Sequence, residues 1–346
     1  MAIGWGVVGA GGIADRRMIP EGIVPSPLCR LAMVMDAVPE RAEAVGRKYG
    51  VPHTTSLEEL LANPQVQAVY IATPVSAHRE QAIASARAGK HVLVEKPLAL
   101  TLQEGREILA ACQEAGVKCA SGYMMRYHGA HQKAKQLIET GALGKVTFAR
   151  AQLTCWYPPI PGAWRQSWAL GGGGALMDLG THCLELLEWL VGPVEALACL
   201  YGTLAMDYEV DDTATVLLRF RGGAQGVVDV SFCVPDQSSL NVLEVRGTRG
   251  ALYARHTLGQ EPGGELVAYI PGEVGGYDAA QAREGREVGQ AVPFERINMY
   301  RAEAEAFVRA IEEGGEPEVS GEVGLRALEL TLRAYEAARA GRFLDV

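Results

Sequence analysis

Apolar residues in the first third of the chain fall into short runs, each followed by a polar, helix-like stretch. The runs predict strands at residues 3–8, 31–35, 66–72, 92–95 and 117–120. Helix starts between them have capping-box spacing, Ser56 with Glu59 and Thr101 with Glu104. Strands that alternate with helices predict a doubly wound parallel sheet covered by helices on both faces.

The pattern changes after about Tyr123. Helices are predicted at residues 128–139, 175–190, 300–312 and 321–340, and strands at 146–153, 213–220, 226–234, 241–246 and 251–255. Glycine-containing turns separate the later strands, as in antiparallel hairpins. Residues 156–174 and 258–292 are predicted to be irregular. We therefore expect an α/β protein of two domains, residues 1–123 and 124–346.

Composition narrows the class of protein. A chain of 346 residues favours two domains, and 48% hydrophobic residues is typical of a soluble protein. A net charge of −9 without a Lys/Arg cluster argues against nucleic acid or an anionic membrane as partner. The seven cysteines are scattered and form no CxxC pair. We expect neither a disulfide framework nor a metal site, and a cytoplasmic location.

A dinucleotide fingerprint follows the first strand: Gly9, Gly11 and Ala14 give the G-x-G-x-x-A form. The glycines permit a tight turn and close approach of a pyrophosphate, which the N–H groups of the helix start would hold. The second strand ends at Asp36, whose carboxylate would accept ribose hydroxyls and favour NAD over NADP. Arg41 would flank the adenine or bind a 2′-phosphate, and a solvated helix arginine explains it at least as well, so NADP stays open.

Candidate active-site residues follow later strands. Thr73 and Pro74 end one strand and would line the nicotinamide ribose, while His78 in the next helix would by itself more often be a surface residue than a ligand. Lys96 ends another strand, in Glu95-Lys96-Pro97. At the carboxyl edge of a parallel sheet, a lysine lies where such sheets bind ligands.

Asp178 and His182 are four residues apart in a predicted helix and would share one face. A carboxylate that holds an imidazole is a proton-transfer device, although an exposed intrahelical pair explains the spacing equally well. The preceding glycines 171–174 suggest close backbone approach to something bound. The aromatic residues Trp156, Tyr157, Trp164 and Trp168 would stack on sugar faces or pack in the core.

These motifs together resemble the Gfo/Idh/MocA oxidoreductases, which include glucose–fructose oxidoreductase and inositol dehydrogenase. The resemblance rests on the G-x-G-x-x-A start, Glu95-Lys96-Pro97, Trp164-Arg165 and Asp178-x-x-x-His182, and extends over nearly the whole chain. The segment 157–165 is also similar to anhydrofructose reductase members of the family. Those members favour NADP and lack an acid at the position of Asp36, so we do not adopt that identity.

The resemblance implies a Rossmann domain followed by an α/β domain with a large, mostly antiparallel open sheet that often mediates oligomerisation, here as a homodimer or homotetramer. It implies that Lys96 contacts ribose and substrate, that the peptide before Pro97 is cis, and that His182, oriented by Asp178, moves the proton. The implied cofactor residues are Gly9, Gly11, Gly12, Ile13, Asp36, Arg41, Thr73, Pro74, His78, Glu95, Lys96, Trp164 and Arg165. The implied substrate residues are Lys96, Tyr123, Arg126, Tyr157, Trp164, Asp178 and His182.

We therefore expect an NAD(P)-dependent oxidoreductase that moves a hydride between nicotinamide and a hydroxyl or keto carbon of a sugar, cyclic polyol or related compound. Two alternatives remain. One is a non-catalytic nucleotide-binding sensor, which would not need Lys96, Asp178 and His182. The other is an enzyme with tightly held NAD that uses transient oxidation to cleave glycosides or to pass hydride between sugars.

Overall fold

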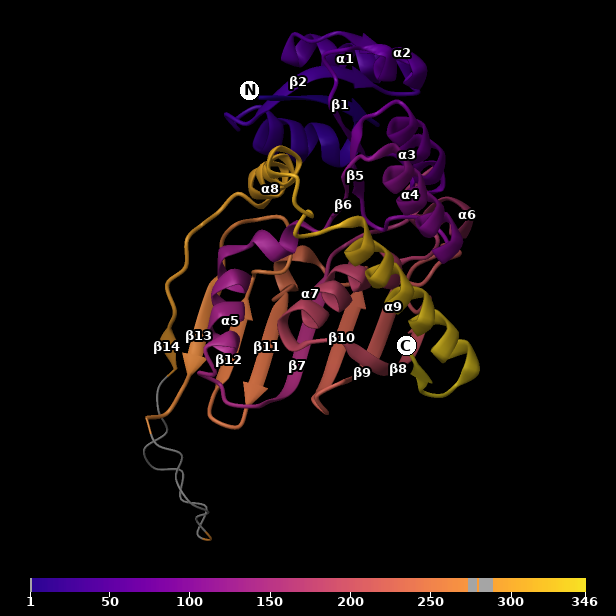
Figure 1. The fold of residues 1–346 in the computed structure, drawn as a ribbon. Helices are drawn as coiled ribbons and strands as arrows, with labels where there is room; N and C mark the ends of the chain where they lie inside the picture. The colour runs from indigo at the N-terminus through magenta and orange to yellow at the C-terminus, as the bar shows by residue number, and fades with distance from the viewer. Residues whose placement is uncertain (1, 273–278, 280–288) are drawn as a thin grey trace.

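The N-terminal part of the chain forms the first sheet, which is parallel. The computed structural model describes residues 2–272, 279 and 289–346 and arranges them around two sheets (Figure 1). The first has the strand order β3-β2-β1-β4-β5-β6, with every pair parallel. Its strands are β1 (Ile3–Val8), β2 (Cys29–Met35), β3 (His53–Thr54), β4 (Ala68–Ile71), β5 (His91–Glu95) and β6 (Cys119–Gly122). The predicted doubly wound sheet is confirmed; only β3, two residues long, gave no apolar run to detect.

Helices cover both faces of this sheet, and their ends follow the capping residues. They are the π-helix η1 (Ala14–Ile23), α1 (Pro39–Tyr49), α2 (Leu57–Ala62), η2 (Val75–Ala77), α3 (His78–Arg87) and α4 (Leu102–Ala115). Ser56 accepts from the Glu59 N–H, and Thr101 with Glu104 forms a complete capping box. Both predicted helix starts are therefore confirmed.

The second sheet has nine strands in the order β14-β13-β12-β11-β7-β10-β9-β8-β15. Adjacent strands in this sheet pair antiparallel, except that β7 and β10 pair parallel. Its strands are β7 (Val146–Thr154), β8 (Val194–Gly202), β9 (Thr213–Phe220), β10 (Gln225–Ser231), β11 (Val242–Gly247), β12 (Ala251–Arg255), β13 (Glu265–Tyr269), β14 (Gln290–Ala291) and β15 (Leu344–Asp345). The implied large, mostly antiparallel sheet is confirmed.

The prediction of loop throughout 258–292 is wrong in part, because β13 and β14 lie there. Strand β13 pairs along its whole length with β12, so tertiary pairing overrides its weak sequence signal. Residues 273–278 and 280–288 of that predicted loop lie outside the described residues.

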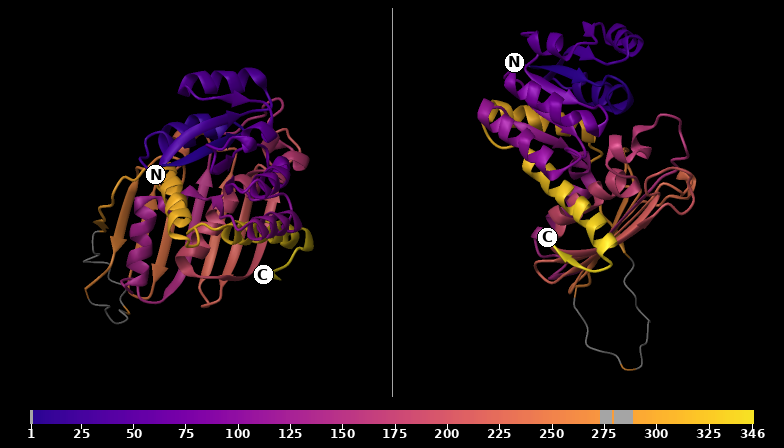
Figure 2. Two further views of the ribbon diagram at one scale, coloured as in Figure 1. Left: turned by 45° about the horizontal axis from the view of Figure 1, so that its top comes forward. Right: turned by 90° about the vertical axis from the view of Figure 1, so that its right-hand side faces the viewer.

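Helices cover one face of the second sheet and leave the other open within the described residues (Figure 2). The covering helices are α5 (Gly129–Glu139), α7 (Thr181–Val191) and α9 (Gly321–Ala340). Helix α8 (Met299–Glu313) instead packs against η1, although nearly 280 residues separate them in the chain (Figure 1). No described helix is long and apolar enough to cross a membrane.

Candidate active site

A cavity of about 670 Å³ lies where the carboxyl ends of β1, β4 and β5 face the second sheet. Its volume is in the range of sites that hold cofactors and small substrates. It brings together most of the residues singled out by the sequence. Its predicted members are Gly12, Ile13, Thr73, Glu95, Lys96, Tyr157, Trp164, Arg165, Asp178 and His182.

The turn after β1 has the close approaches that the fingerprint demands. Gly9 has φ +83°, and a Cβ there would lie 2.8 Å from the carbonyl carbon of Ala72. A Cβ on Gly11 would lie 2.6 Å from Cδ of Arg41. Gly12 has φ +53° and faces open space in the cavity. This loop, at the start of a helix, fits a dinucleotide pyrophosphate.

Asp36 directly follows the end of β2, and its carboxylate is buried and held in place. It accepts from the Val38 N–H at 3.0 Å and from the Arg41 guanidinium at 3.3 Å. The Arg41 side chain therefore crosses Gly11 and lies beside the acid, with about half of its surface exposed. Asp36 and Arg41 are thus adjacent at the predicted adenosine end of the cofactor site.

His78 supports the site without reaching the cavity. Its buried ring contacts the carbonyl oxygens of Thr73 and Pro97, each at 3.1 Å. Burial lowers the pKa of His78 to about 4. His78 therefore ties the ends of β4 and β5 together, and the structure does not present its ring to a cofactor. Pro74 begins the turn η2, and the Lys96–Pro97 peptide is cis, as the resemblance implies.

Lys96 and Asp178 form the central contact of the site. Lys96 Nζ lies 2.5 Å from Asp178 Oδ1, and Arg165 Nε lies 3.1 Å from the same oxygen. Burial alone would raise the pKa of Asp178, but the two cations hold it well below its usual range. The Arg165 guanidinium also stacks 4.2 Å from the ring centre of Trp164. Asp178 is therefore a carboxylate that fixes two cations.

The predicted direct pairing of Asp178 with His182 is not present among the described contacts. His182 is buried, and its Nδ1 has no hydrogen-bond partner. Burial and then Lys96 lower the pKa of His182 well below its usual value, against the opposing charge of Asp178. His182 is therefore a neutral imidazole that lines the same cavity as Lys96 and Asp178.

A break in helical register explains the difference. Residues 176–180 form a π-helix, η5 (Leu176–Gly180), before α7 begins at Thr181. The extra residue per turn removes the simple i, i+4 relation on which the prediction rested. Asp211 anchors this segment by accepting from the N–H groups of Gly174 and Leu176, at 2.9 and 2.8 Å.

The glycine run before η5 approaches the protein itself. A Cβ on Gly174 would lie 1.9 Å from the Asp211 carbonyl oxygen, and one on Gly173 would lie 2.2 Å from the Tyr335 hydroxyl. The expectation that these glycines approach a bound molecule is therefore wrong. These glycines allow the chain that enters the π-helix to pack closely against Asp211, in the loop before β9, and against Tyr335 of α9.

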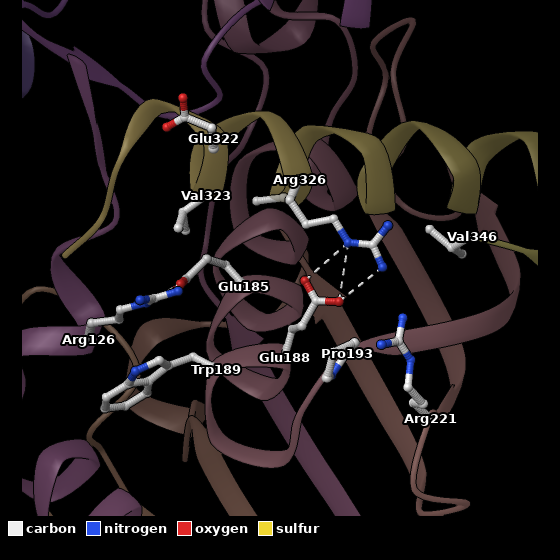
Figure 3. A pocket seen from close by; sticks show the side chains of 11 residues that line it. Arg126, Glu185, Glu188, Trp189, Pro193, Arg221, Glu322, Val323, Arg326 and Val346 are labelled. Atoms are coloured by element: carbon white, nitrogen blue, oxygen red, sulfur yellow. Dashed lines mark hydrogen bonds and ion pairs between the residues drawn. The ribbon is translucent and has the colours of Figure 1, made fainter. Parts of the chain in front are cut away.

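Tyr123 and Arg126 lie behind the cavity. The Tyr123 hydroxyl is 2.7 Å from Thr181 Oγ1, and its ring meets His182 edge to face at 5.5 Å. Arg126 lines a different cavity, where it forms a buried ion pair with Glu185 and donates to the Glu318 carbonyl (Figure 3). The structure thus places Tyr123 against His182 and does not bring Arg126 to the predicted substrate position.

Sequence reasoning missed one wall of the cavity, formed by loops of the second sheet. Asn241 and His256 flank the β11–β12 pairing, and both have left-handed backbone, φ 47° and 57°. Such conformations in residues other than glycine concentrate at functional sites. Beyond them, Glu261 reaches Arg17 of η1 at 2.6 Å and joins the two domains beside the cavity. No local pattern marks these residues, because each depends on pairing between distant strands.

Family models match both parts of the chain. Residues 3–123 match the oxidoreductase family with an NAD-binding Rossmann fold, and residues 131–253 match the GFO/IDH/MocA C-terminal domain. The two matches correspond to the parallel sheet with its glycine loop and to most of the nine-stranded sheet.

The similarity to individual relatives covers the whole chain or nearly all of it. The 1,5-anhydro-D-fructose reductase of Ensifer adhaerens is 31% identical over 99% of this chain and 98% of its own. The crystal structure of the aldose–aldose oxidoreductase from Caulobacter crescentus with glycerol has a TM-score of 0.89 at 29% identity and full coverage of both chains. Levoglucosan dehydrogenase with NADH and levoglucosan has a TM-score of 0.86 at 26% identity, again with full coverage.

Proposed function

Because this chain belongs to the Gfo/Idh/MocA family of oxidoreductases, we propose that Lys96, Asp178 and His182 are the machinery by which it transfers hydride between NAD(P) and a carbinol or keto carbon. The observation that carries the proposal is their convergence. Lys96 at the end of β5 meets Asp178 at 2.5 Å in a cavity that His182 also lines. The glycine loop enters the same cavity through Gly12 and Ile13.

Each residue has a role suited to its environment. His182 is neutral, and a neutral imidazole accepts the hydroxyl proton during oxidation. Lys96 donates a hydrogen bond to the substrate oxygen and stabilises negative charge that develops there. Asp178 holds Lys96 and Arg165 in place, and Tyr123 packs against the imidazole. The nicotinamide cofactor, when bound, supplies the hydride acceptor or donor.

The cofactor residues we propose extend along the glycine loop and the ends of β2, β4 and β5. Gly9, Gly11, Gly12 and Ile13 would hold the pyrophosphate, and Asp36 the adenosine ribose. Asp36 supports NAD, because its carboxylate repels a 2′-phosphate. The neighbouring Arg41 guanidinium compensates part of that charge, so NADPH would still bind, more weakly.

We propose a sugar, anhydrosugar or cyclic polyol as the substrate. The cavity is lined by the aromatic side chains of Trp156, Tyr157 and Trp164 and also by the polar side chains of Asp236, Asn241 and His256. Aromatic faces stack on sugar C–H groups while polar groups bind hydroxyls. By their names, the similar proteins act on anhydrofructose, levoglucosan and aldoses.

Homo-oligomerisation is proposed through the open face of the second sheet. Leu200 and Leu217 are 78% and 46% exposed on the paired strands β8 and β9, and exposed apolar surface of this kind is found at interaction sites. All seven cysteines are free thiols, which supports a reducing cytoplasmic compartment. We also propose that the boundary between the two domains lies between residues 123 and 124.

A cofactor titration followed by a substrate panel tests the function. NADH and NADPH are titrated by nicotinamide fluorescence, and sugars and polyols are then screened at the nicotinamide absorbance. Tight NADH binding with turnover of a sugar supports the proposal. Cofactor that survives gel filtration, with transfer between two sugars, would favour tightly held NAD. Binding without turnover of any substrate would favour the sensor, and no binding of either nucleotide would contradict the assignment.

A further inference from the structure

Helix α8 buries acidic and phenolic groups that the proposed reaction does not use. Glu303 is 3% exposed, and neither of its carboxyl oxygens has a hydrogen-bond partner among the described residues. The buried Tyr300 hydroxyl, one turn earlier on α8, and Glu185 Oε2 on α7 are likewise without a protein partner. Unpartnered buried polar groups are costly, and native proteins usually satisfy them with ordered water.

These groups lie between two cavities. Tyr300 and Glu95 line the cofactor cavity. Glu185 lines a second cavity of about 490 Å³ between α7 and α9, where its other oxygen pairs with Arg126 (Figure 3). Glu303 is close enough to both Glu95 and Glu185 for each carboxylate to act on it electrostatically. Glu303 is therefore a buried acid that interacts with one acid at each cavity, Glu95 at the first and Glu185 at the second.

The surroundings of Glu303 favour its protonated form. Burial, then Glu95 and Glu185, raise the pKa of Glu303 well above its usual range. Burial raises the pKa of Glu185 to about 7, against the opposing charge of Arg126. The titratable groups that interact electrostatically with Glu303 are Tyr70 of β4, Glu95 of β5, Tyr127 of the 3-10 helix η3 (Met124–Tyr127), Glu185 of α7 and Tyr300 of its own helix. Glu303 is thus a proton donor close to proton acceptors, and Arg126, the cation that contacts Glu185, is already paired with it.

We propose that Glu303, with Tyr300 and Glu185, forms a proton path that connects the cofactor cavity to the second cavity. The inference rests on the proposed hydride transfer with His182 as the proton acceptor. A bound sugar and nicotinamide would fill the cofactor cavity and exclude bulk water, so the proton needs another exit.

The path conserves protons at each turnover. In oxidation the substrate C–H bond gives its hydrogen and electron pair to nicotinamide, and the hydroxyl proton passes to His182. His182 then gives that proton, through water and the Tyr300 hydroxyl, to Glu303. Glu303 releases its own proton to Glu185 Oε2, and Glu185 releases one to solvent in the second cavity. Reduction uses the same steps in reverse.

Infrared spectroscopy tests the connection without any substrate. At about pH 9, where Glu185 is ionised, we expect the carbonyl stretch of a protonated carboxyl group in the wild-type protein and in Glu305→Gln, and its loss in Glu303→Gln. Glu305 is a matched control on the same helix that binds Ser26 and Arg301 instead. After transfer to D₂O, Glu185→Gln should slow the deuterium shift of this band by about tenfold or more. A missing band, or equal exchange in Glu185→Gln and wild type, would overturn the proposal.

Turnover on the sugar identified by the substrate panel gives the second test. In Glu303→Gln we expect kcat to fall about tenfold or more, with KM and NADH affinity unchanged and with recovery in concentrated imidazole or formate buffer. Wild type and Glu305→Gln should not depend on buffer concentration. Should Glu303→Gln fail to fold, Glu185→Gln carries the same expectation. A near-normal kcat in Glu303→Gln that does not depend on buffer concentration would overturn the proton path. Absence of turnover in the wild-type protein would instead contradict the proposed function. In that case the infrared result would still decide whether the two cavities are connected.

Discussion

Lys96 Nζ and Asp178 Oδ1 lie 2.5 Å apart although 82 residues separate them in the chain. The lysine ends a strand of the parallel sheet, and the aspartate lies in a π-helix that precedes α7. Their ion pair therefore fixes the two domains relative to each other at the point where chemistry is proposed. Arg165 completes the group from a short 3-10 helix, η4 (Trp164–Gln166), that lies between β7 and η5.

Replacement of Asp178 tests this contact. Asp178→Asn leaves Lys96 and Arg165 without their carboxylate, so we expect a loss of about 3–5 kcal/mol in the free energy of unfolding at pH 7. The pKa of Asp178 is depressed in the folded state, so its stabilisation is fully present above the unfolded value of about 3.9 and is lost as the pH falls further. Urea unfolding should show a constant gap between wild type and variant from pH 5 to 8 that narrows only below about pH 4. A gap that varies across the neutral range would contradict this assignment.

Cofactor choice is expected to depend on Asp36 and Arg41. Asp36→Ser removes the charge that repels a 2′-phosphate and frees Arg41, which lies 3.3 Å from the acid. We expect the affinity for NADPH relative to NADH to rise about tenfold, or about 1.4 kcal/mol. Adding Arg41→Ala should reverse most of that gain. Fluorescence titration with both nucleotides measures the ratio, and an unchanged ratio in Asp36→Ser would show that Asp36 does not contact the ribose.

A buried histidine should make stability depend on pH. His131 contacts the Met125 carbonyl and Thr257, and burial, followed by the neighbouring His128, lowers the pKa of His131 to about 3. In the unfolded chain this histidine is protonated below about pH 6.5, whereas in the folded protein it stays neutral there. The free energy of unfolding therefore falls as the pH drops below about 6.5. The slope of the free energy of unfolding against pH should be smaller in His131→Gln by up to about 1.4 kcal/mol per pH unit, the contribution of one proton. The exposed His53→Gln is the control, and equal slopes in the two variants would exclude the effect.

The sequence predicted the elements better than the contacts between them. Apolar runs located the parallel strands, and Thr101 with Glu104 located a helix start, because these signals are local. Gly9, Asp36 and Lys96 were placed correctly at strand ends for the same reason. The partner of Asp178 was missed, since a π-helix changes the register on which an i, i+4 argument depends.

Residues contributed by distant pairing left no local signal. His256 and Asn241 reach the cavity only because β11 pairs with β12. Glu303 looks like one more acid on an amphipathic helix, and its burial follows from the packing of α8 against the first domain. The glycines 173 and 174 gave a real signal of close approach, but the sequence does not show that Asp211 and Tyr335 are what they approach.

The most direct test of the account is single-turnover hydride transfer in Lys96→Ala and His182→Ala. Each variant is first shown to bind NADH as wild type does, and is then mixed with oxidised cofactor and the sugar found in the panel. The exposed residues Lys145 and His53, changed to alanine, are the matched controls. We expect both site variants to lose about 10²–10⁴ in rate while the controls keep wild-type rates. Near-normal hydride transfer in either cofactor-binding site variant would contradict the proposed mechanism.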